Sequence, residues 1–194
     1  LKTLFKDKQL IKIIGKENID NIIKFKQPSI FISIHHSNWE ICVPYLDSLG
    51  INTGAIYRHI NNKFIDNFVF KKRTEALISQ KSFYTPKGKK SAKDIIEGIK
   101  DNKSVFLLVD QKDSAGEKIN FFGKDVNTQI GFLKIARKYN MPIIPMQNQR
   151  LKNDKFIITF HKAIYNGDKS ITDKVMMLKI HQIIEKWIRN NPKQ

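Results

Sequence analysis

The sequence has one cysteine, few acidic residues and no long apolar run. Each of these features narrows the kinds of structure or partner that the chain can have. Cys42 cannot form a disulfide within the chain, so the 194 residues depend on an ordinary hydrophobic core, which a chain of this length can bury. No apolar run approaches the roughly 18 to 20 residues that a membrane-spanning helix needs. No signal peptide, internal repeat or low-complexity linker is evident. His35 and His36 are adjacent and have no third ligand at a typical spacing, so we expect no metal site.

The low acid count leaves a strongly basic chain. Lys and Arg total 35 against 18 Asp and Glu, which gives a formal net charge of +17. Such a field attracts polyanions: nucleic acid, an anionic membrane surface, a phosphorylated substrate or an acidic protein. Lys, Ile and Asn have AT-rich codons, so genomic bias is an alternative explanation for part of the excess. Charge alone therefore leaves the partner class open.

The stretch from Ser33 to Glu40 carries the most chemistry. Residues 28–35 are short, β-branched and nearly all apolar, which predicts a strand buried on both faces of a parallel sheet. A helix is predicted over 39–49, and ligands bind at this end of the strands in open α/β sheets. Residues i and i+5 of one helix lie about 140° apart, so His35 can meet Glu40 only from the strand end or the turn. We expect Glu40 to orient His35, and neutral His35 to act as general base.

A capping box is the alternative explanation for Glu40. Ser37 would cap the helix, and Glu40 would reach back to the Ser37 amide. Glu40 would then stabilise the helix and have no part in catalysis. We assign His36 to packing.

A second acidic residue follows a second buried strand. Residues 104–109 form a continuous apolar run that ends at Asp110, again at the site end of a sheet, although an Asx turn would also explain this aspartate. Arg58 follows a predicted strand over 53–57, and Arg73 comes later in the chain. Guanidinium groups bind phosphate or carboxylate bidentately, so both arginines are candidates for holding anionic substrate groups or stabilising an oxyanion. A solvated basic face is the alternative.

Strand-like and helix-like segments alternate along the chain, which predicts an α/β fold with a mostly parallel or mixed central sheet flanked by helices. Residues 1–27 are basic and amphipathic, which predicts either a membrane-surface helix or a helix packed on the sheet. Pro142 and Pro145 predict a strand start or a sheet edge for residues 141–146. The other predicted elements are a helix over 93–102, a helix capped by Asn127 and Thr128 that runs through Tyr139, a strand over 155–161, and a last helix over 172–190 with Val175, Leu178, Ile184, Trp187 and Ile188 on its apolar face.

The order of these motifs resembles the lipid A late acyltransferases, the lauroyl/myristoyl transferase family. The block His-His-Ser-Asn-Trp-Glu at 35–40 is similar to the family's His-Phe-Gly-Asn-Trp-Glu. Residues 57–66 are similar to its Tyr-Arg-Pro-x-x-Asn-Pro-x-x-Asp, with His59 in place of the first proline. The Asp-Gln pair at 110–111 and the Phe-Phe-Gly run at 121–123 follow in the family's order. The likeness extends from about residue 15 to residue 194.

The resemblance implies roles for individual residues. His35 and Glu40 match the family's catalytic pair, and Asp110 carries over as catalytic support, paired with Arg73. Asn61 shares its motif position with Asn62. The implied substrate-binding residues are Asn38, Trp39, Tyr57, Arg58, Asn61, Arg73, Phe122 and Thr128.

The resemblance also implies a reaction. A fatty acyl chain would move from an acyl carrier protein or coenzyme A thioester to a hydroxyl of a lipid A precursor or related glycolipid, with no cofactor and no metal. The acidic carrier protein, the phosphorylated acceptor and an anionic membrane surface all suit the positive charge, and the expected location is the cytoplasmic face of the bacterial inner membrane. We expect residues 1–194 to form a single acyltransferase domain that lacks an upstream membrane anchor, because the chain begins at Leu1 and not at methionine. The resemblance also implies that a C-terminal extension is lacking, because the family continues after Gln194 into an aromatic and His-Arg-Arg segment.

Two other functions compete with this one. A glycerolipid (lysophospholipid) acyltransferase shares the His-x4-acid spacing, but that family has Phe-Pro-Glu-Gly-Thr-Arg after its core strand, where this chain has Val109-Asp110-Gln111-Lys112. A basic nucleic-acid-binding domain requires clustered Lys and Arg with exposed stacking aromatic residues. The aromatic residues here lie mostly within apolar strands and stripes, so we expect no nucleic-acid partner.

Overall fold

The computed structural model describes residues 10–165, 167 and 170–194. Within these residues the main sheet has seven strands in the order β1-β9-β8-β2-β5-β3-β4. Neighbouring strands are parallel except β8 and β9, which confirms the α/β class and the mostly parallel sheet. The strands are β1 Ile11–Ile14, β2 Ile30–Ser33, β3 Thr53–Tyr57, β4 Phe83–Pro86, β5 Ser104–Leu108, β8 Ile143–Arg150 and β9 Phe156–Phe160.

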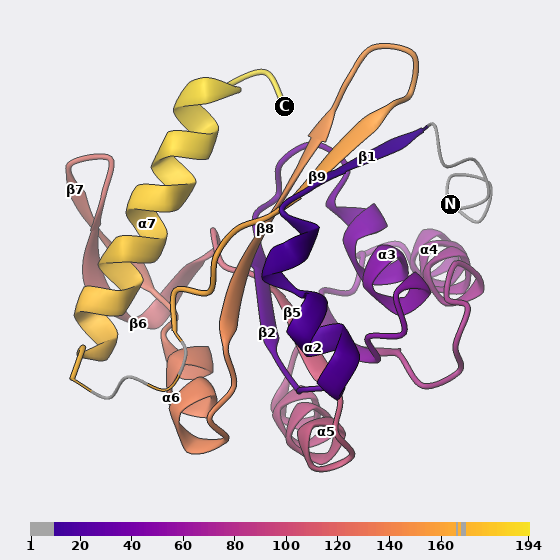
Figure 1. The fold of residues 1–194 in the computed structure, drawn as a ribbon, viewed down its shortest axis with the longest axis horizontal. Helices are drawn as coiled ribbons and strands as arrows, with labels where there is room; N and C mark the ends of the chain where they lie inside the picture. The colour runs from indigo at the N-terminus through magenta and orange to yellow at the C-terminus, as the bar shows by residue number, and fades with distance from the viewer. Residues whose placement is uncertain (1–9, 166, 168–169) are drawn as a thin grey trace.

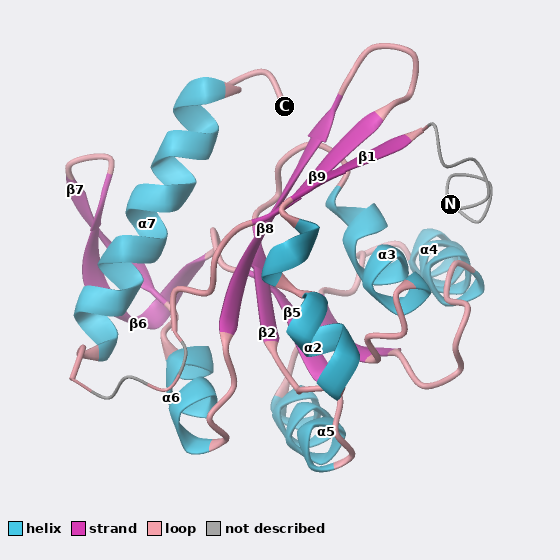
Figure 2. Ribbon diagram, in the orientation of Figure 1, coloured by secondary structure: helices cyan, strands magenta, loops and turns pink. Residues whose placement is uncertain are grey.

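Helices cover both faces of the sheet (Figures 1 and 2). Along β2, Ile30, Ile32 and Ile34 point to a core shared with α5, α6 and α7, whereas Phe31 points to a core shared with α2 and α3. This alternation follows from the two-residue period of a strand. The helices are α2 Asp20–Phe25, α3 Cys42–Ser48, α4 Lys63–Glu75, α5 Lys89–Lys100, α6 Gly131–Lys138 and α7 Asp173–Asn190, with short 3-10 turns at Lys16–Asn18 and Trp39–Ile41.

A separate antiparallel hairpin, β6 Lys112–Phe121 and β7 Lys124–Thr128, packs against α7 on one side of the main sheet (Figure 1). The sequence analysis did not predict this hairpin. Its two-residue turn places both Phe122 (φ 50°) and Gly123 (φ 77°) in the left-handed region. Hairpin turns with two positive φ angles usually carry Asn or Gly at the first position. Because Phe122 occupies that position, the sequence pattern did not indicate a turn here.

One predicted element, the start of one helix and part of one apolar helix face are wrong. Ile11–Ile14 is an edge strand rather than part of a helix, while residues 1–9 of the predicted helix lie outside the described residues. Thr128 ends β7, and α6 begins at Gly131, so Asn127 and Thr128 are not its cap. On α7, the helix predicted over 172–190, Val175 and Leu178 are exposed rather than inward.

Of the two alternatives for the proline-containing strand, the sheet edge is wrong, because β8 lies between β9 and β2. The strand start agrees with Pro142, which directly precedes the first residue of β8. Pro145 is aligned with Ile32 of β2, and its carbonyl accepts a hydrogen bond from the backbone N–H of His161. The imide nitrogen therefore faces β9 at the point where the β8–β9 ladder ends, and the parallel ladder with β2 loses no donor.

No helix within the described part of the chain is long and apolar enough to cross a membrane.

Candidate active site

His35 and Asp110 meet at the carboxyl ends of two adjacent parallel strands. In the β2–β5 ladder Ser33 is aligned with Leu108, so two residues further on His35 comes opposite Asp110. The Asp110 carboxylate accepts the backbone N–H of His35 at 2.9 Å (Oδ2) and the ring Nδ1–H at 2.8 Å (Oδ1). The site therefore follows directly from the pairing of β2 with β5.

This geometry defines the state of the imidazole. An ionised carboxylate only accepts hydrogen bonds, so Nδ1 carries the proton and Nε2 of neutral His35 has a free lone pair. The Gln111 side-chain amide lies 3.2 Å from Nε2 and can donate to it. Burial raises the pKa of Asp110, but the hydrogen bonds from His35 lower it more, so this pKa lies below its usual range. Asp110 thus remains an anion that holds His35 in the tautomer required of a general base.

Glu40 pairs with Arg73 and not with His35. The Arg73 Nε donates to Oε2 at 2.8 Å and a terminal nitrogen donates to Oε1 at 2.5 Å. The expected pairs, Glu40 with His35 and Asp110 with Arg73, are therefore wrong, and the two carboxylates have exchanged partners. The capping box is wrong too, because Asn38 precedes the turn Trp39–Ile41 and no side chain caps it.

The Glu40–Arg73 pair is set among aromatic rings. The guanidinium of Arg73 lies 5.5 Å from the ring centroids of both Trp39 and Tyr57. Its hydrogen bonds to Glu40 raise the pKa of Arg73, and the side chain is only 11% exposed. The Trp39 ring in turn meets the edge of the His35 imidazole at 5.8 Å between centroids. Through Trp39, this ion pair supports the wall beside His35.

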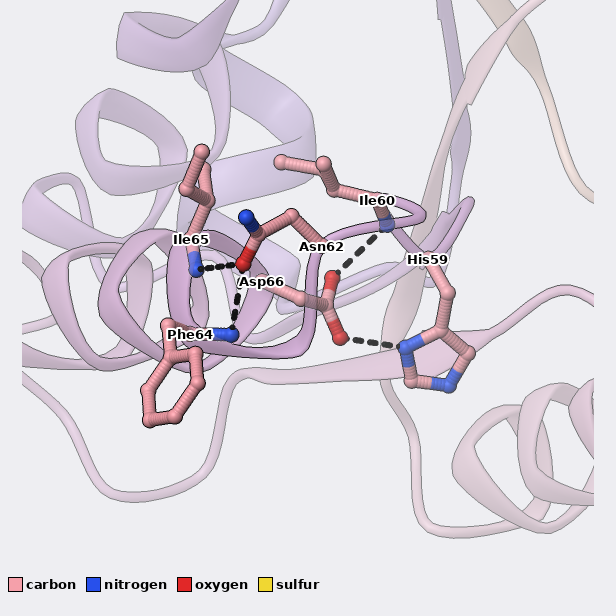
Figure 3. Close-up of polar contacts among 6 residues, drawn as sticks. All are labelled: His59, Ile60, Asn62, Phe64, Ile65 and Asp66. Carbon is pink, nitrogen blue, oxygen red and sulfur yellow. Dashed lines mark hydrogen bonds and ion pairs between the residues drawn. The ribbon is translucent and has the colours of Figure 1, made fainter.

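The motif that follows β3 is a structured loop (Figure 3). Asn62 caps α4 by accepting the backbone N–H groups of Phe64 and Ile65, while Asp66 accepts the backbone N–H of Ile60 and faces the ring of His59 at 2.6 Å. Asn61 is exposed beside them. The motif asparagine with a defined structural contact is therefore Asn62, whereas Asn61 is not among the residues that line the cleft described next.

A cleft of about 800 Å³ opens beside His35 between the sheet, α5 and α6. Its mouth carries three exposed cationic residues, Arg58, Lys87 and Lys112, of which the last two were not selected from the sequence. The more buried Tyr57 and Arg73 also line the cleft. Its wall is apolar and runs along β2 and β5 toward the other end of the strands. The apolar lining residues are Ile30, Ile56, Ile95, Val105, Leu107, Leu108, Val109, Phe132 and Ile135.

Besides Asn61, three predicted binding residues lie outside the lining of the cleft. The structure places Phe122 at the turn of β6 and β7, where its ring lies 4.8 Å from the Arg189 guanidinium carbon. Thr128 is buried beside His181, and with Asp110 it lines a smaller cavity of about 140 Å³ next to the cleft. Asn38 precedes the turn that carries Trp39 and is not among the residues that line the cleft.

Gln111 is another residue at the site that was not selected from the sequence. It directly follows Asp110 in the Asp-Gln pair that resembles the family's motif. Its position directly after Asp110 could have identified it, because a residue that follows a site residue at a strand end faces the same opening.

The other reactive side chain nearby is Cys42, at the start of α3. Burial, followed by the negative charge of Glu40, raises the pKa of its thiol. A buried thiol that resists ionisation is a poor nucleophile. Within the described residues, no group of three or more His, Cys, Asp or Glu side chains could hold a metal ion. The polar side chains that line the cleft therefore include the imidazole of His35, the amides of Gln111 and Gln129, the carboxylate of Asp113 and several cations, and Asp110 supports His35 from behind the lining.

Comparisons with known proteins bear on the family and on the fold of the chain. A family model described as "Bacterial lipid A biosynthesis acyltransferase" matches residues 5–194. No curated protein sequence matches the chain significantly. Among solved structures, the 1-acyl-sn-glycerophosphate (LPA) acyltransferase PlsC from Thermotoga maritima is similar, with a TM-score of 0.52 and 15% identity over 95% of this chain and 73% of that one. At this identity, the likeness to PlsC shows a shared fold.

Proposed function

Because the chain is an acyltransferase that belongs to the bacterial lipid A biosynthesis acyltransferase family, we propose that it moves a fatty acyl chain from a thioester to a hydroxyl of a phosphorylated lipid A precursor or related glycolipid. The donor is an acyl carrier protein or coenzyme A thioester. One observation carries the proposal: the hydrogen-bonded His35–Asp110 pair opens onto a cleft whose wall is apolar and whose mouth is cationic.

The reaction needs no covalent enzyme intermediate. Nε2 of His35 takes the proton from the acceptor hydroxyl, and Asp110 stabilises the imidazolium that forms. The acceptor oxygen attacks the thioester carbonyl, a new ester bond forms, and the carbon–sulfur bond breaks. The imidazolium then returns the proton to the departing thiolate, so atoms and charge balance. Gln111 lies where it can hydrogen-bond to the reacting oxygen as that oxygen replaces it at Nε2.

The cations at the mouth of the cleft suit an anionic acceptor. Arg58 and Lys87 are exposed there, so they are available to phosphate groups. Arg73 is less available, because both carboxylate oxygens of Glu40 already bind it. We therefore assign phosphate binding to Arg58 and Lys87, and we assign Arg73 and Glu40 to support of Trp39 and Tyr57.

The apolar wall suits the acyl chain of the donor. It extends along β2 from His35 to Ile30, a length of about 16 Å at the usual rise of a strand. An extended methylene chain advances about 1.25 Å per carbon, from standard bond lengths and angles. The wall therefore matches a saturated chain of about 12 carbons.

The proposal is tested by incubating the chain with acyl carrier protein and coenzyme A thioesters of 8 to about 18 carbons and a phosphorylated glycolipid acceptor, with mass spectrometry of the product. Lysophosphatidic acid is the parallel acceptor, because the fold is shared with PlsC. We expect an acylated glycolipid from the wild-type chain and none from His35→Ala. Acylation of lysophosphatidic acid alone would overturn the assigned acceptor, and equal product from His35→Ala would overturn the mechanism.

A further inference from the structure

The beginning of α4 exposes a group of large apolar side chains. The exposed fractions are 88% for Phe64, 50% for Ile65, 61% for Phe68 and 38% for Ile60 in the preceding loop. Single exposed apolar residues are common on proteins, but a contiguous group of this kind marks an interaction surface. With Lys63, Lys71 and Lys72, these four residues are called the α4 patch below.

Helix geometry places the patch on one side of α4. At 100° per residue, Phe64, Ile65, Phe68, Lys71 and Lys72 fall within an arc of about 120°. The opposite side of the helix is occupied: Asp66 holds the loop before the helix, Phe70 packs against the core cluster that includes residues of α3, and Arg73 binds Glu40. The outward side chains therefore cannot turn inward without breaking these contacts.

The loop contacts also fix the apolar side chains relative to the cleft. Figure 3 shows Phe64 pointing away from the Asp66–His59 pair, while Ile60 is tied to Asp66 through its backbone N–H. Arg58, at the mouth of the cleft, lies two residues before Ile60 in the same loop. The α4 patch and the mouth of the cleft thus share one loop.

The charges around the patch favour an anionic partner. Lys63, Lys71 and Lys72 are exposed, and Lys72 Nζ lies 5.7 Å from the ring centroid of Phe68. Glu75 is the acidic residue on this side, and it is paired with Lys72 at 2.9 Å and with Lys71 at 3.9 Å. Aromatic and aliphatic side chains ringed by lysines are typical of helices that lie in the interface of an anionic bilayer.

We propose that the α4 patch seats the protein on an anionic lipid bilayer, with Phe64 and Phe68 inserted among the lipid chains and the lysines at the headgroups. The orientation rests on the proposed function, since the mouth of the cleft would then open beside the headgroups where a glycolipid acceptor lies. The binding itself is independent of that function.

The first test places a reporter in the patch. The variant Phe64→Trp is compared with Phe25→Trp. Phe25 is likewise exposed, at 67%, but it lies on α2 and outside the α4 patch. Vesicles of phosphatidylglycerol and phosphatidylethanolamine should shift the emission of the Phe64→Trp variant to shorter wavelength, and brominated acyl chains should quench it. The Phe25→Trp variant should respond no more than the wild type. Emission from Phe64→Trp that is already shifted without lipid would mean that protein, including a second copy of the chain, covers the patch, and it would overturn the proposal.

The second test measures binding by sedimentation with the same vesicles. Replacing both phenylalanines (Phe64→Ser with Phe68→Ser) should lower the partition coefficient about tenfold or more, given the apolar area removed, whereas Phe25→Ser should leave it within about twofold. Pure phosphatidylcholine vesicles should bind the wild-type chain less. Undiminished binding of the double variant, with circular dichroism showing a folded protein, would overturn the proposal; if that variant does not fold, the Phe64→Trp result decides. Neither test contains thioester or acceptor, so a failure of acyl transfer and a failure of docking are seen separately.

Discussion

The Asp110 carboxylate binds His35 twice, through the imidazole Nδ1–H at 2.8 Å and through the backbone N–H at 2.9 Å. One oxygen fixes the ring and the other fixes the chain that carries it. Because β2 and β5 hold both residues at aligned strand ends, the base is oriented before any substrate binds. Glu40, five residues away in sequence, has a different partner.

Replacing Asp110→Asn should lower kcat by about 10²- to 10⁴-fold, because the amide no longer stabilises the imidazolium or enforces the tautomer. The measurement is initial rate with thioester and acceptor at saturation. Asp125→Asn, on an exposed position of β7, is the matched control and should keep the wild-type rate. An Asp110→Asn variant as fast as wild type would show that another group orients His35.

The low pKa of Asp110 has a consequence for stability. A carboxyl whose pKa is lower in the folded protein stabilises the fold above the unfolded value of about 3.9 and loses that contribution as the pH falls through the folded value. The aspartate therefore remains charged throughout the neutral range. Protein held between pH 8 and about pH 5 and then returned to neutral pH should show its full rate, because this carboxylate keeps its contribution to stability over that range.

Arg73→Ala should destabilise the protein by about 2 kcal/mol, because it leaves the Glu40 carboxylate half-buried and without its charged donors. The expected fall in Tm is about 4 to 8 °C for a chain of this size. A double-mutant cycle with Glu40→Gln should give a coupling free energy of about 1 kcal/mol or more. If Glu40→Gln instead leaves Tm unchanged and removes as much activity as His35→Ala, Glu40 acts directly in catalysis.

Ala92→Phe should shift the preferred donor to shorter acyl chains, because Ala92 lines the cleft from α5 and a ring there narrows it. The matched control is Lys93→Phe, which adds the same ring at the next position, outside the cleft lining. Competition among thioesters of different length, read by mass spectrometry, measures the preference. An unchanged product distribution with Ala92→Phe would place the acyl chain elsewhere.

His181 should make the packing of α7 sensitive to acid. Burial lowers the pKa of this histidine, whose ring bonds to the Asn120 carbonyl at 2.8 Å. The unfolded chain therefore binds a proton near pH 6.5, whereas the folded chain binds it only at lower pH. The contribution of His181 to stability is complete above about pH 6.5 and is lost as the pH falls through the lower pKa of the folded protein. Between pH 7 and about 5, the Tm of His181→Gln should fall less than that of Lys179→Gln, an exposed control on the same helix. Equal slopes would assign the acid sensitivity to other groups.

Strands were predicted well where the hydrophobic period and the amino-acid composition of a segment indicated the same element. The strand Thr53–Tyr57 was predicted at the bounds that the structure shows, and the two apolar runs that end near His35 and Asp110 are both buried strands. Pairing between elements was harder. A spacing of five residues is visible in a sequence, whereas the adjacency of β2 and β5, with β3 on the far side of β5, is a property of the whole sheet. For that reason His35 was assigned to Glu40 instead of Asp110.

Two other misses have local causes. Ile11–Ile14 alternates partly buried and exposed residues as an edge strand does, but the lysines around it made a helical stripe equally plausible. The first half of β6 is small and polar, without the β-branched residues that usually indicate a strand, and its turn uses Phe122. Both strands are stabilised by their neighbours more than by their own propensity.

The end of the chain also bears on how the site is assembled during synthesis. The Nε2–H of His36, next to the proposed base His35, donates to the carbonyl of Asn191 at 2.7 Å, and the two residues are 155 positions apart. At about 5 to 20 residues per second, the ribosome makes Asn191 roughly 8 to 30 seconds after His36. β2 is therefore synthesised that long before the hydrogen bond between His36 and Asn191 can form. The surroundings of His35 are complete only after the whole of α7 has been synthesised.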